Sequence, residues 1–212
     1  MPSYDYIIAI DFEATCWDDN IPIRQRVSEI IEFPAVLFNL KTGKIEAEFH
    51  EYLKPIERPI LSDFCKKLTG ISQNTVDNGK TLPIVLKMFQ EWLSKVLNER
   101  NLVSPKTSKD NLAGNVALVT WSNFDLGTFL HNECKRKKLE KPEIFNRWID
   151  ICVIYSQCYV TRARRFCDAL KRAGVHVDGR LHSGIDDARN LASLTYKMVQ
   201  LGTTLKITAD LE

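Results

Sequence analysis

Apolar and polar positions divide the chain into a strand-rich first part and a helix-rich second part. Residues 6–10 form an unbroken apolar run, which is typical of a buried strand. Two longer runs, 29–40 and 45–55, flank a glycine-containing turn at 41–44, and this arrangement predicts an antiparallel hairpin. Pro34 lies inside the first of these runs. It predicts a bulge or an edge position there, because proline has no N–H to give to a ladder.

Helical periodicity dominates from the middle of the chain onward. Ser62 can cap a short helix that runs through Leu68, and apolar residues at helical spacing mark an amphipathic helix over 84–96. The polar stretch 98–115 predicts a loop, and 116–121 predicts one more buried strand. Further helices are expected at 123–138, 150–159, 165–173 and 186–201. Strands followed by β–α alternation favour an α/β fold, with a mixed sheet flanked by helices.

Length and composition narrow the class of protein. The chain has 212 residues, and we expect a single domain over residues 1–212 with its own core. Its hydrophobic content of 44% and charged content of 26% are ordinary for a globular protein in water. The net charge is only +2, so a nucleic-acid site would have to rest on local clusters of charge. No membrane span and no secretory signal are expected, because long apolar runs are missing from the sequence.

The six cysteines include no C-x-x-C pair, so a zinc site is not expected. Without a secretory signal they are expected to be reduced thiols in a cytosolic or nuclear protein. Cys16 lies close to the candidate chemistry described next. Its expected role is that of a small packing residue and not that of a nucleophile.

Four acids and one histidine have the identity and order of a two-metal nuclease site. They are Asp11 and Glu13 after the first strand, Asp125 in "VTWSNFDLG", and His182 and Asp187 in "LHSGIDDARN". Mg²⁺ prefers carboxylate oxygens. Two such ions about 3.5–4 Å apart can hold the attacking and the leaving oxygen of a phosphodiester. Histidine side chains ordinarily titrate near pH ~6.5 and can take the proton of an attacking water. The set therefore predicts metal-dependent phosphodiester hydrolysis.

The local spacing of these residues suits that chemistry. Asp11 and Glu13 stand at i and i+2, so both side chains are expected on one face at the end of a strand. The segment "DFEATC" has no glycine, which disfavours a phosphate-cradling nucleotide loop. His182 lies in a polar Ser-Gly loop, and Asp187 follows where a helical pattern begins. A loop-borne base and a helix-borne metal ligand can therefore lie side by side.

Two of the acids also fit a purely structural role. Ser122-x-x-Asp125 and Ser183-x-x-Asp186 both match a capping box at the start of a helix. For Asp125 the five-residue constellation favours metal binding. For Asp186 we expect capping.

Two basic clusters and one tryptophan leave alternatives open. The clusters at 134–138 and 162–165 either contact phosphate groups or lie in solvent at helix ends, where cations also suit the helix dipole. The first is also compatible with a nuclear localisation signal. Trp17 either lines a substrate groove or covers the core.

Taken together, the motifs resemble a known family. "DFEATC", "TWSNFDLG" and "HSGIDDARN" resemble the three motifs of the DEDDh 3′-to-5′ exonucleases. "EIIEFPAVL", "LSDFCKKLTGIS" and "RWIDI" are similar to the Eri-type exoribonuclease branch, and a short form without extra domains resembles its Snipper-like members. The resemblance runs from about Tyr4 to about Ile207. It implies a ribonuclease-H-like fold, with a five-stranded mixed sheet and helices around it.

The resemblance also implies roles for individual residues. The ligands of two Mg²⁺ ions, which Mn²⁺ can replace, would be Asp11, Glu13, Asp125 and Asp187. His182 would be the general base. The backbone near Phe12 and Ala14 would meet the terminal nucleotide, and the rings of Phe64 and Phe124 would pack on its base. Relatives often carry tryptophan at the position of Phe124, so stacking is expected to be weaker here.

The implied activity is 3′-to-5′ removal of nucleoside 5′-monophosphates from a nucleic acid with a free 3′ end. RNA is favoured as the partner, and no membrane or obligate protein partner is expected. One alternative is a 3′-to-5′ exonuclease that prefers DNA, and another is a catalytically silent nucleic-acid-binding module. The intact set of four acids and a histidine argues against the silent module, because a binding protein has no need to crowd like charges.

Overall fold

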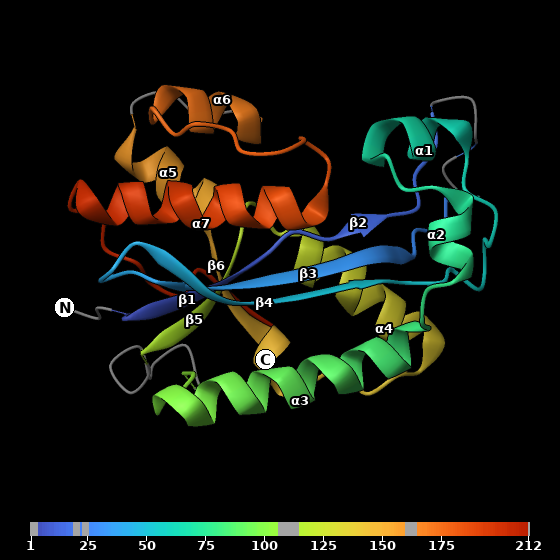
Figure 1. Ribbon diagram of the computed structural model, residues 1–212, viewed down its shortest axis with the longest axis horizontal. Coiled ribbons are helices and arrows are strands. Elements are labelled where there is room, and N and C mark those ends of the chain that lie inside the picture. The colour runs from blue at the N-terminus through green and yellow to red at the C-terminus, as the bar shows by residue number, and fades with distance from the viewer. Residues whose placement is uncertain (1–3, 19–21, 23–25, 106–114, 160–164, 212) are drawn as a thin grey trace.

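The fold is built on one mixed sheet, seen edge-on in the computed structural model (Figure 1). The structure describes residues 4–18, 22, 26–105, 115–159 and 165–211. The strands are β1 (Tyr6–Ile10), β2 (Glu13–Ala14), β3 (Ile30–Asn39), β4 (Lys44–Tyr52), β5 (Val116–Thr120), β6 (Arg147–Asp150) and β7 (Ala209–Asp210). The prediction of five strands is therefore wrong by two. The additional pairings include the two-residue strands β2 and β7, which are too short to leave a periodic pattern in the sequence.

The sheet has the order β2-β3-β1-β5-β6-β7, with β4 paired to β3. Strands β1, β5 and β6 run parallel to one another, and β3 runs antiparallel to β1, β2 and β4. The predicted hairpin over β3 and β4 is confirmed. Side chains of β1 alternate between two buried clusters: Ile7 and Ala9 belong to one, Ile8 and Ile10 to the other. Burial on both faces explains why this strand is apolar throughout.

Helices cover both faces of the sheet. They are α1 (Asp63–Thr69), α2 (Gln73–Asp77), α3 (Leu82–Arg100), η2 (Phe124–Leu130), α4 (His131–Lys137), η3 (Glu143–Asn146), α5 (Ile151–Cys158), α6 (Phe166–Arg172) and α7 (Gly184–Gln200). Figure 1 shows α5, α6 and α7 on one side of the sheet, α3 on the other, and α1 and α2 beyond the end of β2. The helix predicted over 123–138 begins as the π-helical segment η2 and continues as α4. Among the described residues, no helix combines the length and the apolar character that a membrane crossing needs.

Pro34 is neither at an edge nor at a bulge, so both options predicted for it are wrong. It lies inside β3, which is paired on both sides, and the register shift against β4 falls at residues 37–38. On the other side, the pairing with β1 ends at Ala35 and the pairing with β2 begins at Glu32. Pro34 therefore stands beside a gap in the ladder. On the opposite side of this gap, residues 11–12 join β1 to β2, and residue 11 is the first candidate acid.

Candidate active site

The five candidate residues come from four places in the chain and meet at the carboxyl end of β1. Asp11 directly follows β1, and Glu13 lies in β2. Asp125 is the second residue of η2. His182 lies in the loop before α7, and Asp187 lies in the first turn of that helix. The fold thus brings together residues that are up to 176 positions apart, as the sequence motifs predicted.

Three of these side chains form a compact group. The possible ligand atoms of Glu13, His182 and Asp187 all lie within 4.8 Å of one another. Glu13 and Asp187 are buried, whereas His182 is exposed. In the described part of the chain, the Oδ1 atom of Asp187 is buried without a hydrogen-bond partner. A buried carboxylate oxygen without a donor is costly unless a cation binds it. The donor set therefore fits a hard divalent cation.

Burial raises the pKa of every acid in this cluster, and the charges of neighbouring carboxylates add to the rise. Burial, followed by the charges of Glu32 and Asp187, raises the pKa of Glu13 to about 8. Burial is also the main reason why the pKa of Asp125 rises to about 7 and that of Asp187 to about 6. The pKa of Asp11 lies well above its ordinary value because of burial and the charge of Asp125. The carboxylates are crowded in a way that bound cations would relieve.

A hydrogen bond joins the end of β1 to η2. The backbone N–H of Phe12 donates to Oδ1 of Asp125 at 2.7 Å. The Phe12 ring packs edge-on against Phe33 in the core, with 4.6 Å between ring centroids. The carbonyl of Ala14 accepts the thiol of Cys65 at 3.8 Å. Both backbone segments are thus fixed within the protein, and their contact with a terminal nucleotide stays a prediction.

The loop that carries His182 has an unusual backbone conformation. The φ angle of His182 is 63°, in the left-handed region that few residues other than glycine adopt. Its backbone N–H donates to Oδ2 of Asp187 at 2.7 Å. Left-handed residues persist where the surroundings hold them, and they cluster at functional sites. The hydrogen bond to Asp187 supplies that restraint and keeps the histidine beside the acid.

The predicted capping role of Asp186 is wrong. Ser183 is the N-cap of α7, but its side chain makes no capping hydrogen bond. The Asp186 carboxylate instead accepts the backbone N–H of Arg180 at 3.0 Å and pairs with Arg189 at 3.2 Å. The loop before α7 folds back over the first turn of that helix, and Asp186 holds it there through the bond to Arg180.

The backbone N–H groups at the start of α7 donate to Glu32, which was not predicted as a site residue. Its two carboxylate oxygens accept the backbone N–H groups of Gly184 at 3.0 Å and Ile185 at 3.1 Å. His50 lies 2.8 Å from the same carboxylate. The sequence signal was a glutamate inside the apolar run of β3. A glutamate that is 1% exposed must be paired.

The two aromatic rings that were predicted to stack on the terminal base are both exposed. Phe64 of α1 is 42% exposed, and Phe124 at the start of η2 is 61% exposed. Arg180 joins the His182 loop to α1, because its Nη2 atom donates to the carbonyls of Lys67 and Leu68 at 2.9 Å. Exposed rings of this kind are free to stack on a base, so the predicted stacking role of both rings is compatible with their positions.

Cys16 and the basic cluster at 134–138 have structural partners. A hydrogen bond with Cys65 raises the pKa of the Cys16 thiol, which disfavours a nucleophilic thiolate. Lys137 pairs with Glu29 at 2.7 Å and with Glu133 at 2.5 Å, and Arg136 pairs with Glu57 at 2.8 Å. In the second basic cluster, residues 162–164 lie outside the described residues.

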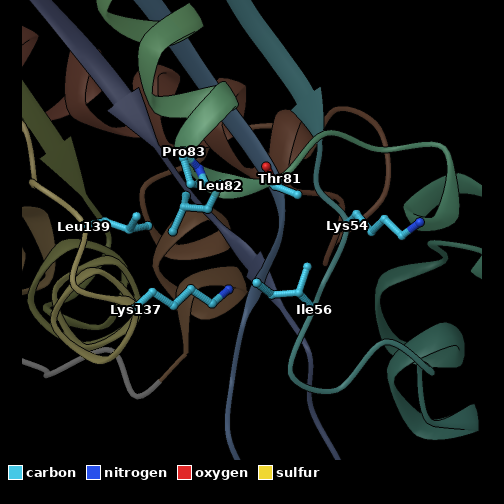
Figure 2. A pocket seen from close by; sticks show the side chains of 7 residues that line it. All are labelled: Lys54, Ile56, Thr81, Leu82, Pro83, Lys137 and Leu139. Atoms are coloured by element: carbon cyan, nitrogen blue, oxygen red, sulfur yellow. The ribbon is translucent and has the colours of Figure 1, made fainter.

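A cavity of about 300 Å³ lies away from the acids, at the start of α3. Figure 2 shows Leu82, Pro83 and Leu139 around it, with Ile56 opposite and the ammonium group of Lys54 pointing away. None of the five candidate residues lines it. This cavity is therefore separate from the chemistry proposed below.

Comparison with known proteins decides the family. A family model described as Exonuclease (RNase_T) matches residues 8–195, a range that contains all five candidate residues. The chain belongs to the exonuclease family. Among solved structures, this exonuclease is similar to the nuclease domain of 3′hExo, a DEDDh family member bound to rAMP. That similarity has a TM-score of 0.85 and 37% identity, and it covers 98% of each chain. The predicted DEDDh resemblance and the ribonuclease-H-like α/β fold are both confirmed.

Similar curated proteins differ in how much of their length this exonuclease matches. The 3′-5′ exonuclease Snipper of Drosophila melanogaster is 53% identical, over 100% of this chain and 75% of that protein. The human protein named ERI1 exoribonuclease 2 is 46% identical, over 98% of this chain and 30% of that protein. The predicted similarity to the Eri-type branch and to Snipper is confirmed. The chain spans less than a third of the length of the human relative.

Proposed function

We propose that this exonuclease removes nucleotides one at a time from the free 3′ end of RNA, in a metal-dependent reaction that releases nucleoside 5′-monophosphates. The observation that carries the proposal is the convergence of Glu13, His182 and Asp187 within 4.8 Å in a chain of the exonuclease family. RNA is favoured because the human relative is named an exoribonuclease. We also propose that residues 1–212 form one domain, since both buried clusters pack on the same sheet.

Four carboxylates would hold the metal ions, either Mg²⁺ or Mn²⁺: Asp11, Glu13, Asp125 and Asp187. Two bound ions would lower the pKa of the attacking water and neutralise charge on the leaving oxygen. The raised pKa values of these acids support this assignment, because such a cluster of charge is unfavourable by itself. The buried Oδ1 of Asp187 supplies a ligand position that no protein donor satisfies among the described residues.

His182 would act on the water. Its ring takes one proton as the water oxygen forms a bond to the phosphorus of the terminal nucleotide. The bond from that phosphorus to the 3′ oxygen of the preceding nucleotide breaks, and the leaving oxygen takes a proton from solvent. His182 is exposed, so its ring can pass the accepted proton to bulk water before the next cycle.

Phe64 and Phe124 would hold the terminal base, and the backbone from Phe12 to Ala14 would lie against the free 3′ hydroxyl. Stacking on aromatic rings is worth about 1–3 kcal/mol per base and tolerates every base. Little sequence preference is therefore expected. A 3′ phosphate should block the reaction, because it adds charge and bulk beside four carboxylates.

The test uses one 5′-labelled oligoribonucleotide with either a 3′ hydroxyl or a 3′ phosphate. With Mg²⁺ we expect a ladder of shortened products and free 5′-monophosphates from the hydroxyl form only, and no products in EDTA. Equal degradation of both forms would contradict recognition of the end. Cleavage of a circular strand would show an endonuclease instead.

A DNA substrate is the second candidate, since Snipper is named an exonuclease without restriction to RNA. Parallel digestion of RNA and DNA of one sequence, single-stranded and with a 3′ overhang, separates the two. A higher kcat/KM on DNA would replace the RNA assignment. Binding of both without any metal-dependent turnover would identify a silent binding module.

A further inference from the structure

The side chain of Arg180 fastens the turn that carries His182 to α1. Its Nη2 atom donates to the carbonyls of Lys67 and Leu68, both at 2.9 Å. In Figure 1 the loop that leads into α7 reaches toward α1. We propose that Arg180 is a positioning residue of the reaction, which holds the His182 ring where it can act on the attacking water. This inference rests on the proposed function and names a further residue on which that function depends.

The turn needs support from outside because of its backbone conformation. Residues 180–183 form a tight turn, in which the backbone N–H of Ser183 donates to the Arg180 carbonyl at 3.2 Å. His182 is the third residue of this turn, and its φ angle is 63°. Glycine is the usual residue where a turn requires a positive φ, since a side chain makes that conformation costly. A histidine stays in it only where its surroundings hold the backbone.

Arg180 binds through its backbone as well as through its side chain. Its N–H donates to Oδ2 of Asp186, in the first turn of α7, at 3.0 Å. Gly179 lies tightly against the same carboxylate, since a Cβ atom there would be 2.3 Å from Cγ of Asp186. One residue thus connects the first turn of α7, the His182 turn and α1. The backbone bonds remain when the side chain is shortened, so a substitution of Arg180 tests the link to α1 alone.

The end of α1 is well suited to a guanidinium. The last carbonyls of a helix have no partner within it and carry partial negative charge, so a cation that donates to them is favourable. Gly70 ends the helix in the left-handed conformation, with a φ angle of 76°. It also leaves room for Arg180, because a Cβ atom on Gly70 would lie 1.8 Å from Nη1 of that side chain. The guanidinium is thus seated at the end of the helix.

The helix α1 is itself fixed to β2, the strand that carries Glu13. The Cys65 thiol of α1 donates to the Ala14 carbonyl at 3.8 Å. Cys65 is fully buried, in a cluster that includes a side chain of β3. Because Ala14 directly follows Glu13, α1 relates the position of this acid to that of the His182 turn. Arg180 supplies the last link between them, and the two residues it relates converge within 4.8 Å.

The kinetics of Arg180→Ala on a 5′-labelled oligoribonucleotide in Mg²⁺ test the proposal. We expect kcat to fall by about 10- to 100-fold with little change in KM, since a catalytic group misplaced by about 1 Å can cost about 10²-fold. Arg180→Lys keeps the charge but loses the planar fork, so its kcat should lie between the two. Lys87→Ala is the matched control, because it removes an exposed positive charge from α3, on the other side of the sheet (Figure 1). It should keep the wild-type kcat.

A double-mutant cycle shows whether Arg180 acts through His182. In the His182→Asn background the base is absent, so Arg180→Ala should lower kcat by less than about twofold further. A general loss of structure would lower kcat by the same factor in both backgrounds, and that result would overturn the proposal. A rise in KM with the wild-type kcat would also overturn it, because Arg180 would then contact a phosphate of the substrate directly.

Amide hydrogen exchange, followed by NMR in the metal-free protein, tests the link to α1 without turnover. The Ser183 N–H should exchange about tenfold faster in Arg180→Ala than in the wild type, because the turn opens more readily, and at the wild-type rate in Lys87→Ala. A wild type without Mg²⁺-dependent hydrolysis would contradict the proposed function, and faster exchange would still support the link. Hydrolysis by the wild type, with equal kcat and equal exchange in Arg180→Ala, would overturn this inference alone.

Discussion

Glu32 and Gly184 are joined by a 3.0 Å hydrogen bond that anchors the start of α7 on the sheet. The other oxygen of the same carboxylate accepts the N–H of Ile185. His182 and Asp187 lie on either side of this helix start in the chain, so Glu32 helps to fix the position of both residues in the proposed metal site. A glutamate that binds no ligand in the proposed mechanism thus positions two residues that act in it.

Glu32→Ala should destabilise the protein and weaken metal binding together. It leaves the N–H groups of Gly184 and Ile185 without an acceptor, and each unsatisfied buried donor costs about 1–3 kcal/mol. Glu32→Gln keeps one carboxamide oxygen and should restore part of both properties. Urea denaturation measures the free energy of unfolding, and calorimetry measures Mn²⁺ affinity.

His50→Ala is the matched control, because it removes the other partner of the same carboxylate and leaves the helix cap in place. It should change Mn²⁺ affinity less than Glu32→Ala does. A Glu32→Ala variant with the unfolding free energy and Mn²⁺ affinity of the wild type would show that the start of α7 keeps its position without this cap.

Gly184→Ala tests the contact on the other side of the helix start. A Cβ atom there would lie 2.6 Å from the backbone oxygen of Asp11, and backbone cannot move aside as a flexible side chain can. We expect a loss of about 1–3 kcal/mol, the usual cost of overpacking, with a larger loss of kcat than of substrate affinity. Ser183→Ala is the control, since that side chain makes no capping bond. Equal activity of both variants would contradict the close approach.

The acids of the site could be predicted because each stands at a recognisable boundary. Asp11 follows an apolar strand, and Asp187 follows a Ser-Gly loop where helical periodicity begins. Strands and helices bring their own ends to defined places, so residues at these ends can be expected to meet. Four carboxylates and a histidine at one place then predict metal-dependent hydrolysis of a phosphodiester.

The contacts that hold the start of α7 could not be predicted, because they join residues that are distant in the chain. The acceptor of the Gly184 N–H lies 152 residues earlier, and nothing in the local sequence "HSGIDD" distinguishes a cap by Glu32 from a cap by Ser183. The same reasoning explains the error over Asp186, which fits a capping box but binds Arg180 instead. Local propensity cannot decide between acceptors when tertiary structure supplies a better one.

The crowded carboxylates predict that the metal-free protein loses stability as the pH rises. A raised pKa means that the folded state retains a proton that the unfolded chain has released. Below about pH 4 the acids are protonated in both states, and no penalty exists. The free energy of unfolding should then fall as the pH rises from there toward the folded-state pKa values, which are about 6 for Asp187, about 7 for Asp125 and about 8 for Glu13, and level off above them. Thermal melts in EDTA at pH 5 and pH 8 measure the loss, and Mg²⁺ should reverse it mainly at pH 8.

Asp11→Asn should abolish cleavage while it raises the melting temperature in EDTA at pH 8 more than at pH 5, because it removes one charge from the cluster. Asp63→Asn serves as the control, since that acid is exposed and pairs with Lys66 outside the cluster. Normal hydrolysis by Asp11→Asn would contradict the two-metal assignment. A fall in its melting temperature at pH 8 would contradict the repulsion.

His182 is predicted to act as a base and not as a metal ligand, and its backbone dictates how this is tested. Because its φ angle is 63°, an alanine at this position adds strain to the loss of the ring. Asparagine tolerates the left-handed conformation better, so His182→Asn should keep the hydrogen bond from this N–H to Asp187 while it removes the base. We expect kcat to fall by roughly 10²–10⁴, the usual contribution of general acid–base catalysis, with little change in affinity for the oligonucleotide.

Mn²⁺ affinity separates the two roles of the histidine, since its ring nitrogen lies within 4.8 Å of ligand atoms of Glu13 and Asp187. A base that binds no metal leaves Mn²⁺ affinity in the His182→Asn variant equal to that of the wild type. A tenfold or greater loss, with kcat restored at saturating Mn²⁺, would make His182 a ligand. The water would then need another base, and Glu13 would be the first candidate, because its raised pKa of about 8 suits proton transfer near neutral pH.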